Sequence, residues 1–274
     1  MVSENTGEFW KQKYLEGEKE GDVESIVRSV RRNSQSLRHP LLSQVNRLYP
    51  DLSRIHICEV GAGWGSASLA LALRGARVTL LDVSEVALRQ ASSLAAALGI
   101  SVECLQEDIF NLPPELEDQF DVALSAGLIE HFQGSRRKEA ISNHLRLVKS
   151  GGLIGIGVPN AVCPFYRLWK FIAERKDWWS VDFEKPYTRR ELSSLCRGLP
   201  LSGVKIRGSD FSYAVNRFFL DKLYWGLRNI LVHGSPAGGG DVFRSPAWLK
   251  IPEMGWPFSE YWGYSLVLIA TRSR

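Results

Sequence analysis

The order of apolar and amphipathic segments between residues 54 and 159 constrains the fold more than any other feature of this chain. Short apolar segments rich in Val, Ile and Leu alternate with longer segments that begin at Ser and end at Gly, as helices commonly do. Strands that alternate with helices pair into a parallel sheet with helices on both faces. The sequence therefore predicts an α/β fold with a doubly wound sheet. The expected strands are residues 54–60, 76–83, 101–108, 120–126 and 153–159, and the expected helices are residues 66–75, 84–99 and 135–152.

The regions on either side of this alternation differ from it in composition. Residues 8–49 carry apolar residues at helical spacing, which predicts an N-terminal helical segment over residues 1–50. Residues 161–188 and 212–263 are rich in Trp, Phe, Tyr and Gly. Two further expected strands, "VKIRGSDF" and "YSLVLIATR", flank the second of these segments. We expect a main domain over residues 51–274, with cap insertions at about 161–188 and 212–263.

The bulk composition bounds the cellular setting and the partners. With 274 residues, 45% of them hydrophobic, the chain has enough apolar surface for a packed core. Its N-terminus is charged and lacks the basic start and apolar stretch of a signal peptide, and no window approaches the roughly 18 apolar residues of a membrane span. The four cysteines are far apart, as in a reducing compartment. We expect a cytoplasmic protein, and its net charge of +4 with scattered basic residues disfavours a nucleic-acid partner.

A glycine-rich turn follows the first expected strand, in the stretch "CEVGAGWG". Gly61, Gly63 and Gly65 stand on alternate positions just before a helix, where the backbone can come close to a ligand. A dinucleotide site has its third glycine one residue later, in the pattern G-x-G-x-x-G. Glu59 would repel a pyrophosphate at this turn but suits a cation, such as the amino group of a methionine moiety. The turn thus favours a sulfonium amino acid over a dinucleotide.

Two more acids stand at the ends of the next two strands. Asp82 ends "VTLLD" at the distance from the turn where a carboxylate accepts hydrogen bonds from both hydroxyls of a ribose. Asp108, in "QEDIF", is placed to accept from the adenine amine while the amide of Ile109 donates to a ring nitrogen. Each acid alone also fits a helix N-cap. Because ligands bind at the carboxyl edge of such a sheet, the acids together predict an adenosine site.

Taken together, these motifs resemble the class I S-adenosylmethionine-dependent methyltransferases. "CEVGAGWG" is similar to the family's first motif, "LLD" to its ribose motif, "EDIFNLP" to its adenine motif, "FDVALSAGLIEHF" to its fourth-strand motif, and "LRLVKSGGLIGIGVPN" to the approach to its fifth strand. The resemblance is close over residues 55–160. It implies a seven-stranded, mostly parallel sheet whose last strand, "YSLVLIATR", is antiparallel and inserted next to "VKIRGSDF".

The resemblance also implies a cofactor, S-adenosyl-L-methionine, and the residues that bind it. The backbone of Gly61 and Gly63 would follow the methionine portion, and Glu59 would lie near its amino group. Asp82 would bind the ribose, and the end of the fourth strand would lie under the methionine amine. The expected cofactor-binding residues are Glu59, Gly61, Ala62, Gly63, Gly65, Asp82, Val83, Asp108, Ile109, Ser125 and Ala126.

His131, in "GLIEHF", is the candidate catalytic base, because it follows the fourth strand at the ligand edge and imidazole titrates near neutral pH. The alternative is that its ring packs on the cofactor or bonds the backbone. Related ubiquinone-pathway O-methyltransferases hold a divalent metal with "EH" and a carboxylate three residues before the Glu. That position is Gly127 here, so Glu130 and His131 have no third ligand nearby in sequence, and we expect no metal.

The acceptor is expected to contact the segments that are added to the sheet. Their aromatic residues would enclose an apolar or aromatic small molecule, or form the cap's own core. The expected helix 215–232 is apolar around most of its circumference, which favours burial or a dimer contact over membrane docking. We therefore expect a monomer or a homodimer. The tryptophans in these segments are Trp169, Trp178, Trp179, Trp225, Trp248, Trp256 and Trp262.

We therefore expect a methyltransferase that transfers a methyl group to an oxygen or nitrogen of a small, partly apolar molecule by in-line displacement. The alternatives are a methyltransferase that acts on a protein, an RNA or a lipid-like quinone, and a non-catalytic binding protein on the same scaffold. A nicotinamide-dependent oxidoreductase is disfavoured by the glycine spacing and by Glu59. Amino methylation of nucleic acids is disfavoured because "SAGL" follows the fourth strand in place of an Asn or Asp followed by Pro-Pro and an aromatic residue.

Overall fold

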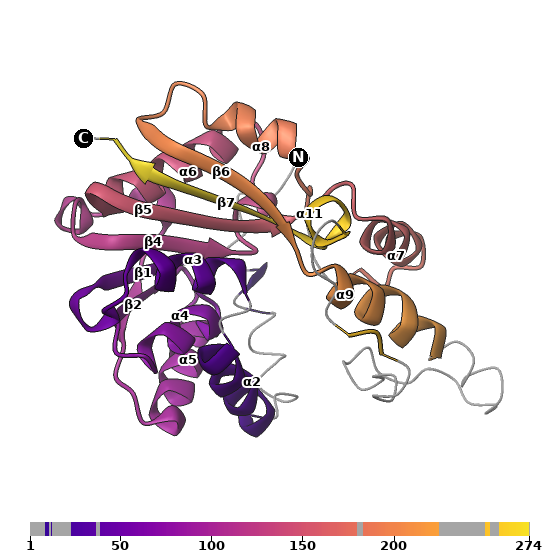
Figure 1. The fold of residues 1–274 in the computed structure, drawn as a ribbon, viewed down its shortest axis with the longest axis horizontal. Coiled ribbons are helices and arrows are strands. Elements are labelled where there is room, and N and C mark those ends of the chain that lie inside the picture. Colours follow the sequence, from indigo (N-terminus) through magenta and orange to yellow (C-terminus); the bar gives the residue numbers. More distant parts are fainter. Residues whose placement is uncertain are drawn as a thin grey trace.

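A seven-stranded sheet with the order β3-β2-β1-β4-β5-β7-β6 forms the centre of the protein in a computed structural model (Figure 1). The structure describes residues 9, 10, 12, 23–36, 39–179, 183–224, 250–252 and 258–273. The strand order reverses between β1 and β4, which places a ligand-binding crevice at their carboxyl ends in sheets of this kind. The strands are β1 (His56–Val60), β2 (Arg77–Asp82), β3 (Glu103–Gln106), β4 (Phe120–Ala126), β5 (Val148–Pro159), β6 (Leu201–Ser209) and β7 (Ser265–Arg272).

The direction of the strands matches the expected sheet. β1 pairs in parallel with β2 and β4, β2 with β3, and β4 with β5. β7 is inserted between β5 and β6 and is antiparallel to both, with Ile156 opposite Leu268 and Ile206 opposite Leu268 on the other side. The predicted doubly wound sheet with an antiparallel last strand is thereby confirmed.

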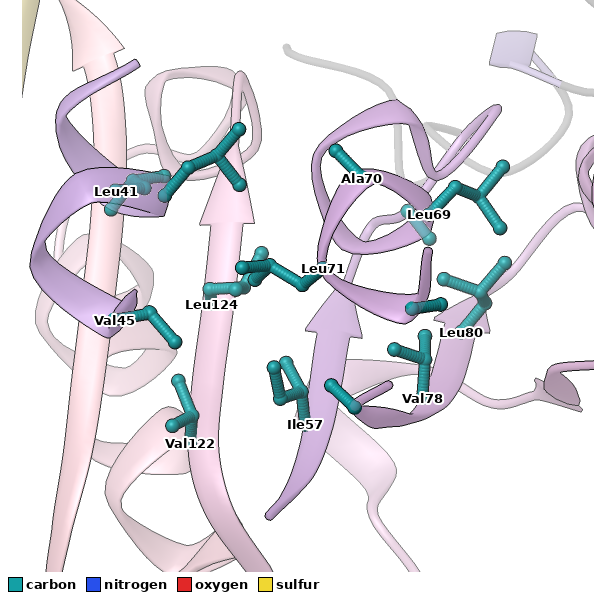
Figure 2. Packing of buried hydrophobic residues seen from close by; sticks show 14 of the residues in the cluster. Leu41, Val45, Ile57, Leu69, Ala70, Leu71, Val78, Leu80, Val122 and Leu124 are labelled. Atoms are coloured by element: carbon teal, nitrogen blue, oxygen red, sulfur yellow. The ribbon is translucent and has the colours of Figure 1, made fainter. Parts of the chain in front are cut away.

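Helices cover both faces of the sheet (Figure 1). On one face, α3, α4 and α5 pack on the strands, and α2 lies over α4 and α5. Figure 2 shows Leu41 and Val45 of α3 beside Val122 and Leu124 of β4. On the other face, α6 and α8 cover β4, β5 and β7. The helices are α2 (Val23–Ser36), α3 (Pro40–Leu48), α4 (Ser66–Ala72), α5 (Glu85–Leu98), α6 (Arg136–Leu147) and α8 (Arg189–Leu195).

Two helices differ in how closely their ends follow the Ser and Gly signals of the sequence. The hydroxyl of Ser84 accepts from the amide of Ala87, and Gly99 ends α5 in the left-handed conformation, both as expected. The helix expected over residues 135–152 ends earlier than predicted. α6 ends at Leu147, and β5 begins at once, so that Gly151 lies within β5, where the register against β4 shifts.

Additional helices gather beyond the carboxyl ends of β4 and β5 (Figure 1). Tyr166 is fully buried there among aromatic rings that include Trp179, Phe218 and Tyr264. The helices are α7 (Pro164–Arg175), α9 (Phe211–Ala214), the π-helical stretch η5 (Val215–Leu220) and α11 (Phe258–Trp262).

The predicted helix 215–232 is described only up to Tyr224, and the rest of it lies outside the described residues, as do Trp225, Trp248 and Trp256. In the described part, Val215 is buried but Phe219 and Leu223 are exposed. Burial within the chain is therefore wrong for these two residues, and the dimer contact stays a prediction. No helix within the described ranges combines the length and the apolar character that crossing a membrane requires.

Candidate functional site

The glycine-rich turn connects β1 to α4 and is held in a backbone conformation that favours glycine. Gly61, Gly63 and Gly65 have φ angles of 60°, 53° and 65°. A Cβ atom on Gly61 would lie 2.6 Å from Cδ1 of Leu128, and one on Gly65 would lie 2.9 Å from Cδ1 of Leu80. The backbone angles favour glycine at all three positions, and the lack of space is a second reason at Gly61 and Gly65.

Glu59 lies inside the protein directly before this turn. Its side chain is buried, and its Oε2 accepts a hydrogen bond from the amide of Ser68 at 3.0 Å. Burial raises the pKa of Glu59 to about 7, and the negative charge of nearby Asp82 adds to this shift. A buried carboxylate of this kind is stabilised when a cation binds beside it.

Asp82 connects the end of β2 to the same turn. Its Oδ2 accepts from the amide of Gly63 at 2.9 Å, and its Oδ1 accepts from the amide of Ser84 at 2.8 Å. Burial raises the pKa of Asp82, although these backbone hydrogen bonds oppose the shift. Each carboxylate oxygen can accept more than one hydrogen bond, so Asp82 can hold the turn and bind a ligand at the same time.

The third predicted acid is more open to solvent than the first two. Asp108 is exposed and caps the short turn η2 (Ile109–Asn111) by accepting from the amide of Phe110 at 2.9 Å. Ile109 is buried, and its carbonyl accepts from the side-chain amide of Asn143 at 2.9 Å. Asp108 therefore has the capping role that was considered as the alternative, and it still stands at the carboxyl edge of the sheet.

The end of β4 completes this side of the crevice. Ser125 is fully buried, and its hydroxyl has no hydrogen-bond partner among the described residues. Ala126 is exposed, and the amide of Gly127 donates to the carbonyl of Gly157 at 3.0 Å. A buried hydroxyl without a partner costs free energy, so Ser125 is a site that a polar ligand group could satisfy.

His131 lies in the short turn η4 (Ile129–His131) that follows β4. Its Nδ1 is 2.6 Å from the carbonyl oxygen of Phe183, and its ring makes an edge contact with Trp10, with 5.0 Å between ring centroids. Because a carbonyl oxygen only accepts, Nδ1 carries a proton in this contact, which leaves the lone pair of the neutral ring on Nε2. Backbone bonding and ring packing, the alternative considered for His131, both occur.

A second acid, Glu184, lies beside Glu130 and His131. One ring nitrogen of His131 and one carboxylate oxygen from each glutamate lie within 4.8 Å of one another. Glu130 is buried, and burial, with the charge of Glu184, raises its pKa to about 8. The amide of Lys185 donates to the carbonyl of Glu130 at 3.0 Å, which fixes the position of the Glu184 segment against η4.

Arg137 stabilises this arrangement from α6. Its guanidinium group is buried and donates to the hydroxyl of Tyr187 at 2.7 Å, to the carbonyl of Lys185 at 2.9 Å, and to the carboxylate of Glu191. The hydroxyl of Tyr187 in turn donates to the carbonyl of Ile129 at 3.0 Å. Residues 183–187 are thus bonded to both η4 and α6.

The structure brings the predicted residues into two groups. Glu59, Asp82 and the glycines are directly connected at the ends of β1 and β2, whereas His131 belongs to the group beyond β4. Glu184 was not identified from the sequence, because it is far from Glu130 along the chain and stands in a segment without strand or helix periodicity. The exposed position of Asp108 and the buried hydroxyl of Ser125 also depend on the fold.

Comparison with known proteins identifies a matching family. Residues 57–152 match a family model described as a methyltransferase domain. The ubiquinone biosynthesis O-methyltransferase of Rickettsia conorii is 24% identical over 200 residues, which cover 72% of this chain and 68% of that protein. The ubiquinone biosynthesis O-methyltransferase of Pseudomonas syringae pv. tomato is 37% identical over 98 residues, which cover 36% of this chain and 41% of that protein.

Solved structures share the fold at low sequence identity. One is the 1,6-didemethyltoxoflavin-N1-methyltransferase of Burkholderia thailandensis with bound 1,6-didemethyltoxoflavin and S-adenosylhomocysteine. Its TM-score is 0.56 at 15% identity, and the match covers 97% of this chain and 88% of that chain. The likeness extends well beyond the residues that match the family model.

Proposed function

This chain is a class I S-adenosylmethionine-dependent methyltransferase, and we propose that it transfers the methyl group to an oxygen or nitrogen of a small, partly apolar molecule. Its methyl donor is S-adenosylmethionine. The observation that carries the proposal is the pair of buried carboxylates, Glu59 and Asp82, on either side of a turn that comes close to any ligand at the carboxyl edge.

We assign the two carboxylates different parts of the donor. Glu59 faces the ammonium group, because a bound cation offsets the cost of burying its negative charge. Asp82 accepts from the ribose hydroxyls with the lone pairs that the amides of Gly63 and Ser84 do not use. The remaining contacts in this assignment are Gly61, Ala62, Gly63 and Gly65 along the methionine portion, Val83 beside the ribose, Asp108 and Ile109 at the adenine, and Ser125 and Ala126 under the amine.

Methyl transfer from a sulfonium requires mainly that the protein positions the two reactants, and little catalysis by side chains. The donor supplies a methyl group that its sulfonium already activates, so the acceptor's lone pair forms a bond to carbon while the carbon–sulfur bond breaks and its electron pair stays on sulfur. The protein aligns the acceptor with that bond and excludes water. The proton of a hydroxyl acceptor leaves to a base. His131 would act through Nε2, since Nδ1 is bonded to Phe183.

The acceptor is proposed to bind among the helices beyond β4 and β5. Aromatic side chains are concentrated in that region: Tyr166 and Tyr264 pack in its core, and Tyr213, in ring contact with Tyr264, is 49% exposed. Such a setting suits an aromatic or otherwise apolar small molecule. All four cysteines are free, as expected for a protein that works in the reducing cytoplasm, which is where we place it.

A second candidate acceptor is a lipid-like quinone precursor. The relatives with sequence similarity are named for ubiquinone biosynthesis and are O-methyltransferases. In this chain, Phe171 of α7 is 52% exposed and Trp178 after it is 49% exposed, and apolar surface of this kind suits an acceptor with a long apolar tail.

The donor and the acceptor require separate experiments. Calorimetric titration with S-adenosylhomocysteine should detect binding to the wild-type protein and strong loss in Asp82→Ala. A panel of phenols, catechols, aromatic amines and quinone precursors with short tails is then incubated with the donor, and products heavier by one methylene group are sought by mass spectrometry. The proposal fails if S-adenosylhomocysteine does not bind, or if it binds equally well to Asp82→Ala.

A further inference from the structure

Glu130 is a buried carboxylate beyond the end of β4 with one oxygen that accepts no hydrogen bond. It is 2% exposed, and its Oε2 has no hydrogen-bond partner among the described residues. A buried carboxylate oxygen without a donor is costly, and a ligand that donates to it removes this cost. We propose that Glu130 binds a protonated amine on the methyl acceptor, so that the substrates are cationic amines with an apolar or aromatic group. This inference rests on the proposed methyl transfer, because it names the acceptor of that reaction.

The hydroxyl groups around Glu130 donate to other acceptors. The hydroxyl of Tyr187 donates to the carbonyl of Ile129 at 3.0 Å, and the hydroxyl of Tyr166 donates to the carboxylate of Glu184. Burial raises the pKa of both tyrosines, and the negative charge of Glu130 contributes in the same direction, so both phenols lie within reach of its charge. Because each hydroxyl has only one proton to donate, Oε2 of Glu130 needs a donor from elsewhere.

The charges around Glu130 favour a cation. A carboxylate oxygen of Glu184 lies within 4.8 Å of a carboxylate oxygen of Glu130. Burial raises the pKa of Glu130 to about 8, and the charge of Glu184 adds to this shift, while the charge of Arg137 opposes it. The guanidinium group of Arg137 forms its ion pair with Glu191. A bound ammonium group would therefore give ionised Glu130 an ion pair that the described residues do not give it.

Lys170 is a second buried cation near these acids. Its ammonium group lies 3.1 Å from Glu174 and 3.9 Å from Oε1 of Glu184, and it lies over the ring of Trp179 at 3.9 Å from the centroid. Its charge is thus divided between Glu184, an exposed carboxylate and an aromatic face. Lys170 balances the charge of Glu184 in part, whereas Oε2 of Glu130 is still without a bond.

Gly127 gives a ligand access to the carboxylate of Glu130. It is the exposed residue that follows β4, and a Cβ atom there would lie 3.5 Å from Oε1 of Glu130. Because glycine has no side chain, residue 127 covers this carboxylate with backbone alone. The next residue, Leu128, packs on the cofactor turn, since its Cδ1 lies 2.6 Å from the position of a Cβ atom on Gly61. Glu130 therefore stands beside the segment that connects the donor side of the crevice to the acceptor side.

The aromatic rings near Glu130 suit an ammonium group with an apolar substituent. Tyr166 and Tyr264 are in edge contact, with 5.4 Å between ring centroids. Burial raises the pKa of Tyr264, and the charges of Glu184 and Glu130 add to this shift, which places its phenol near both acids. Aromatic faces attract ammonium groups. A neutral alcohol can also donate to Glu130, but it leaves the buried charge unbalanced, so the surroundings favour an amine.

Glu130 also accounts for the proton of such an acceptor. An ammonium nitrogen has no lone pair, so one proton first passes from it to the carboxylate of Glu130. The neutral nitrogen then forms a bond to the methyl carbon while the carbon–sulfur bond breaks and its electron pair stays on sulfur. The product is a methylated ammonium ion. Because the raised pKa of Glu130 is closer to that of an amine than the pKa of an ordinary carboxyl group is, this proton transfer is less unfavourable.

Pairs of compounds that differ only in the amine test the assignment. Phenethylamine and hexylamine are the probes, and phenethyl alcohol and hexanol are their neutral counterparts. Each compound is titrated by calorimetry, at neutral pH, into the full-length protein saturated with S-adenosylhomocysteine. We expect each amine to bind at least about tenfold more tightly than its alcohol, because only the amine gives Glu130 a charged hydrogen bond. With S-adenosylmethionine, mass spectrometry should show amines that are heavier by one methylene group.

Three variants separate a role in binding from a role in folding. Glu130→Gln should lose both the preference for the amine and the methylation, whereas Glu130→Asp keeps the charge and should keep part of the preference. Glu174→Gln is the matched control, since it removes an exposed carboxylate beside Lys170, and it should behave like the wild type. Circular dichroism establishes that each variant folds, and all three should bind S-adenosylhomocysteine normally.

The wild-type comparison of amine with alcohol does not depend on the folding of a variant. The proposal is overturned if neither amine binds more tightly than its alcohol, if the bound amines gain no methyl group, or if folded Glu130→Gln keeps the wild-type preference. Binding of S-adenosylhomocysteine is measured first and by itself. A protein that does not bind it contradicts the proposed function, whereas a protein that binds it and does not distinguish amines from alcohols contradicts only the assignment of the acceptor.

Discussion

The carboxylate of Asp82 accepts a hydrogen bond from the amide of Gly63 at 2.9 Å, and this bond fastens the glycine-rich turn to the end of the neighbouring strand. The same carboxylate accepts from Ser84 at the start of α5. Asp82 therefore organises the backbone around the site before any ligand arrives. Its proposed contact with the ribose adds to a structural role that the residue already has.

Replacement of Asp82 should weaken cofactor binding more than an ordinary surface change does. In Asp82→Asn, the amide NH₂ group must face either Gly63 or Ser84, where one donor then meets another. Hydrogen bonds to a charged group contribute about 1.5 to 3 kcal/mol, so we expect the Kd for S-adenosylhomocysteine to rise at least about tenfold. Calorimetry measures this change. Glu85→Gln, which alters an exposed ion pair with Arg89 one helical turn away, is the control and should bind normally.

Glu59 should make stability fall as the pH rises. Its pKa is raised by burial from an ordinary value of 4.5 to about 7 in the folded protein. The stabilisation is therefore fully present below about pH 4.5 and is lost as the pH rises through about 7. The shift corresponds to at most about 3 kcal/mol. Urea unfolding at pH 5, 6, 7 and 8 should show a steeper loss for the wild type than for Glu59→Gln, and parallel curves would contradict the assignment.

The same ionisation should act in the opposite direction on the cofactor. If Glu59 binds the ammonium group as a carboxylate, affinity for S-adenosylhomocysteine rises between pH 6 and 8 in the wild type. Glu59→Gln should bind weakly and lose this pH dependence. Asp82 is the nearest other acid in the site, and it is present in both proteins, so the difference between them isolates Glu59. A wild-type affinity that does not change over this range would exclude this role.

Gly61→Ala tests how tightly the turn is constrained. Gly61 has a φ angle of 60°, and an added Cβ would lie 2.6 Å from Leu128. Gly99 also has a positive φ angle, of 75°, but an added Cβ there meets nothing within 4 Å. We expect Gly99→Ala to cost about 1 to 2 kcal/mol from backbone strain and Gly61→Ala to cost about 1 to 3 kcal/mol more from overpacking. Denaturant unfolding measures both, and equal losses would show that Leu128 moves aside easily.

The sequence predicted the features that depend on local signals. The capping of α5 by Ser84 and Gly99 is one such case, and the strands up to β5 follow from the alternation of segments. Where the signal was ambiguous, the prediction was wrong. The helix expected over residues 135–152 ends at a glycine pair, but both glycines lie within β5, since the chain turns directly from α6 into that strand at Val148.

Features that depend on distant parts of the chain were not predictable in this way. The pairing of β7 between β5 and β6 followed only from resemblance, because nothing local places a terminal strand inside a sheet. Glu184 reaches Glu130 through a loop held by Arg137 and Tyr187, and that path has no periodic pattern in sequence. The π-helical η5 likewise exposes Phe219, although its composition indicated burial.

Arg137 should control the position of the Glu184 segment. Its guanidinium group makes three hydrogen bonds that a lysine ammonium cannot reproduce in the same fork geometry, and it lies over the ring of Tyr187 at 3.5 Å. We expect Arg137→Lys to lower the free energy of unfolding by about 1 to 3 kcal/mol and to speed amide hydrogen exchange in residues 183–187 beyond its effect elsewhere.

Arg136→Lys, at an exposed neighbouring position, is the control and should change stability by about 0.5 kcal/mol or less. Unchanged exchange in residues 183–187 would instead mean that Tyr187, through its bond to Ile129, holds the segment without Arg137.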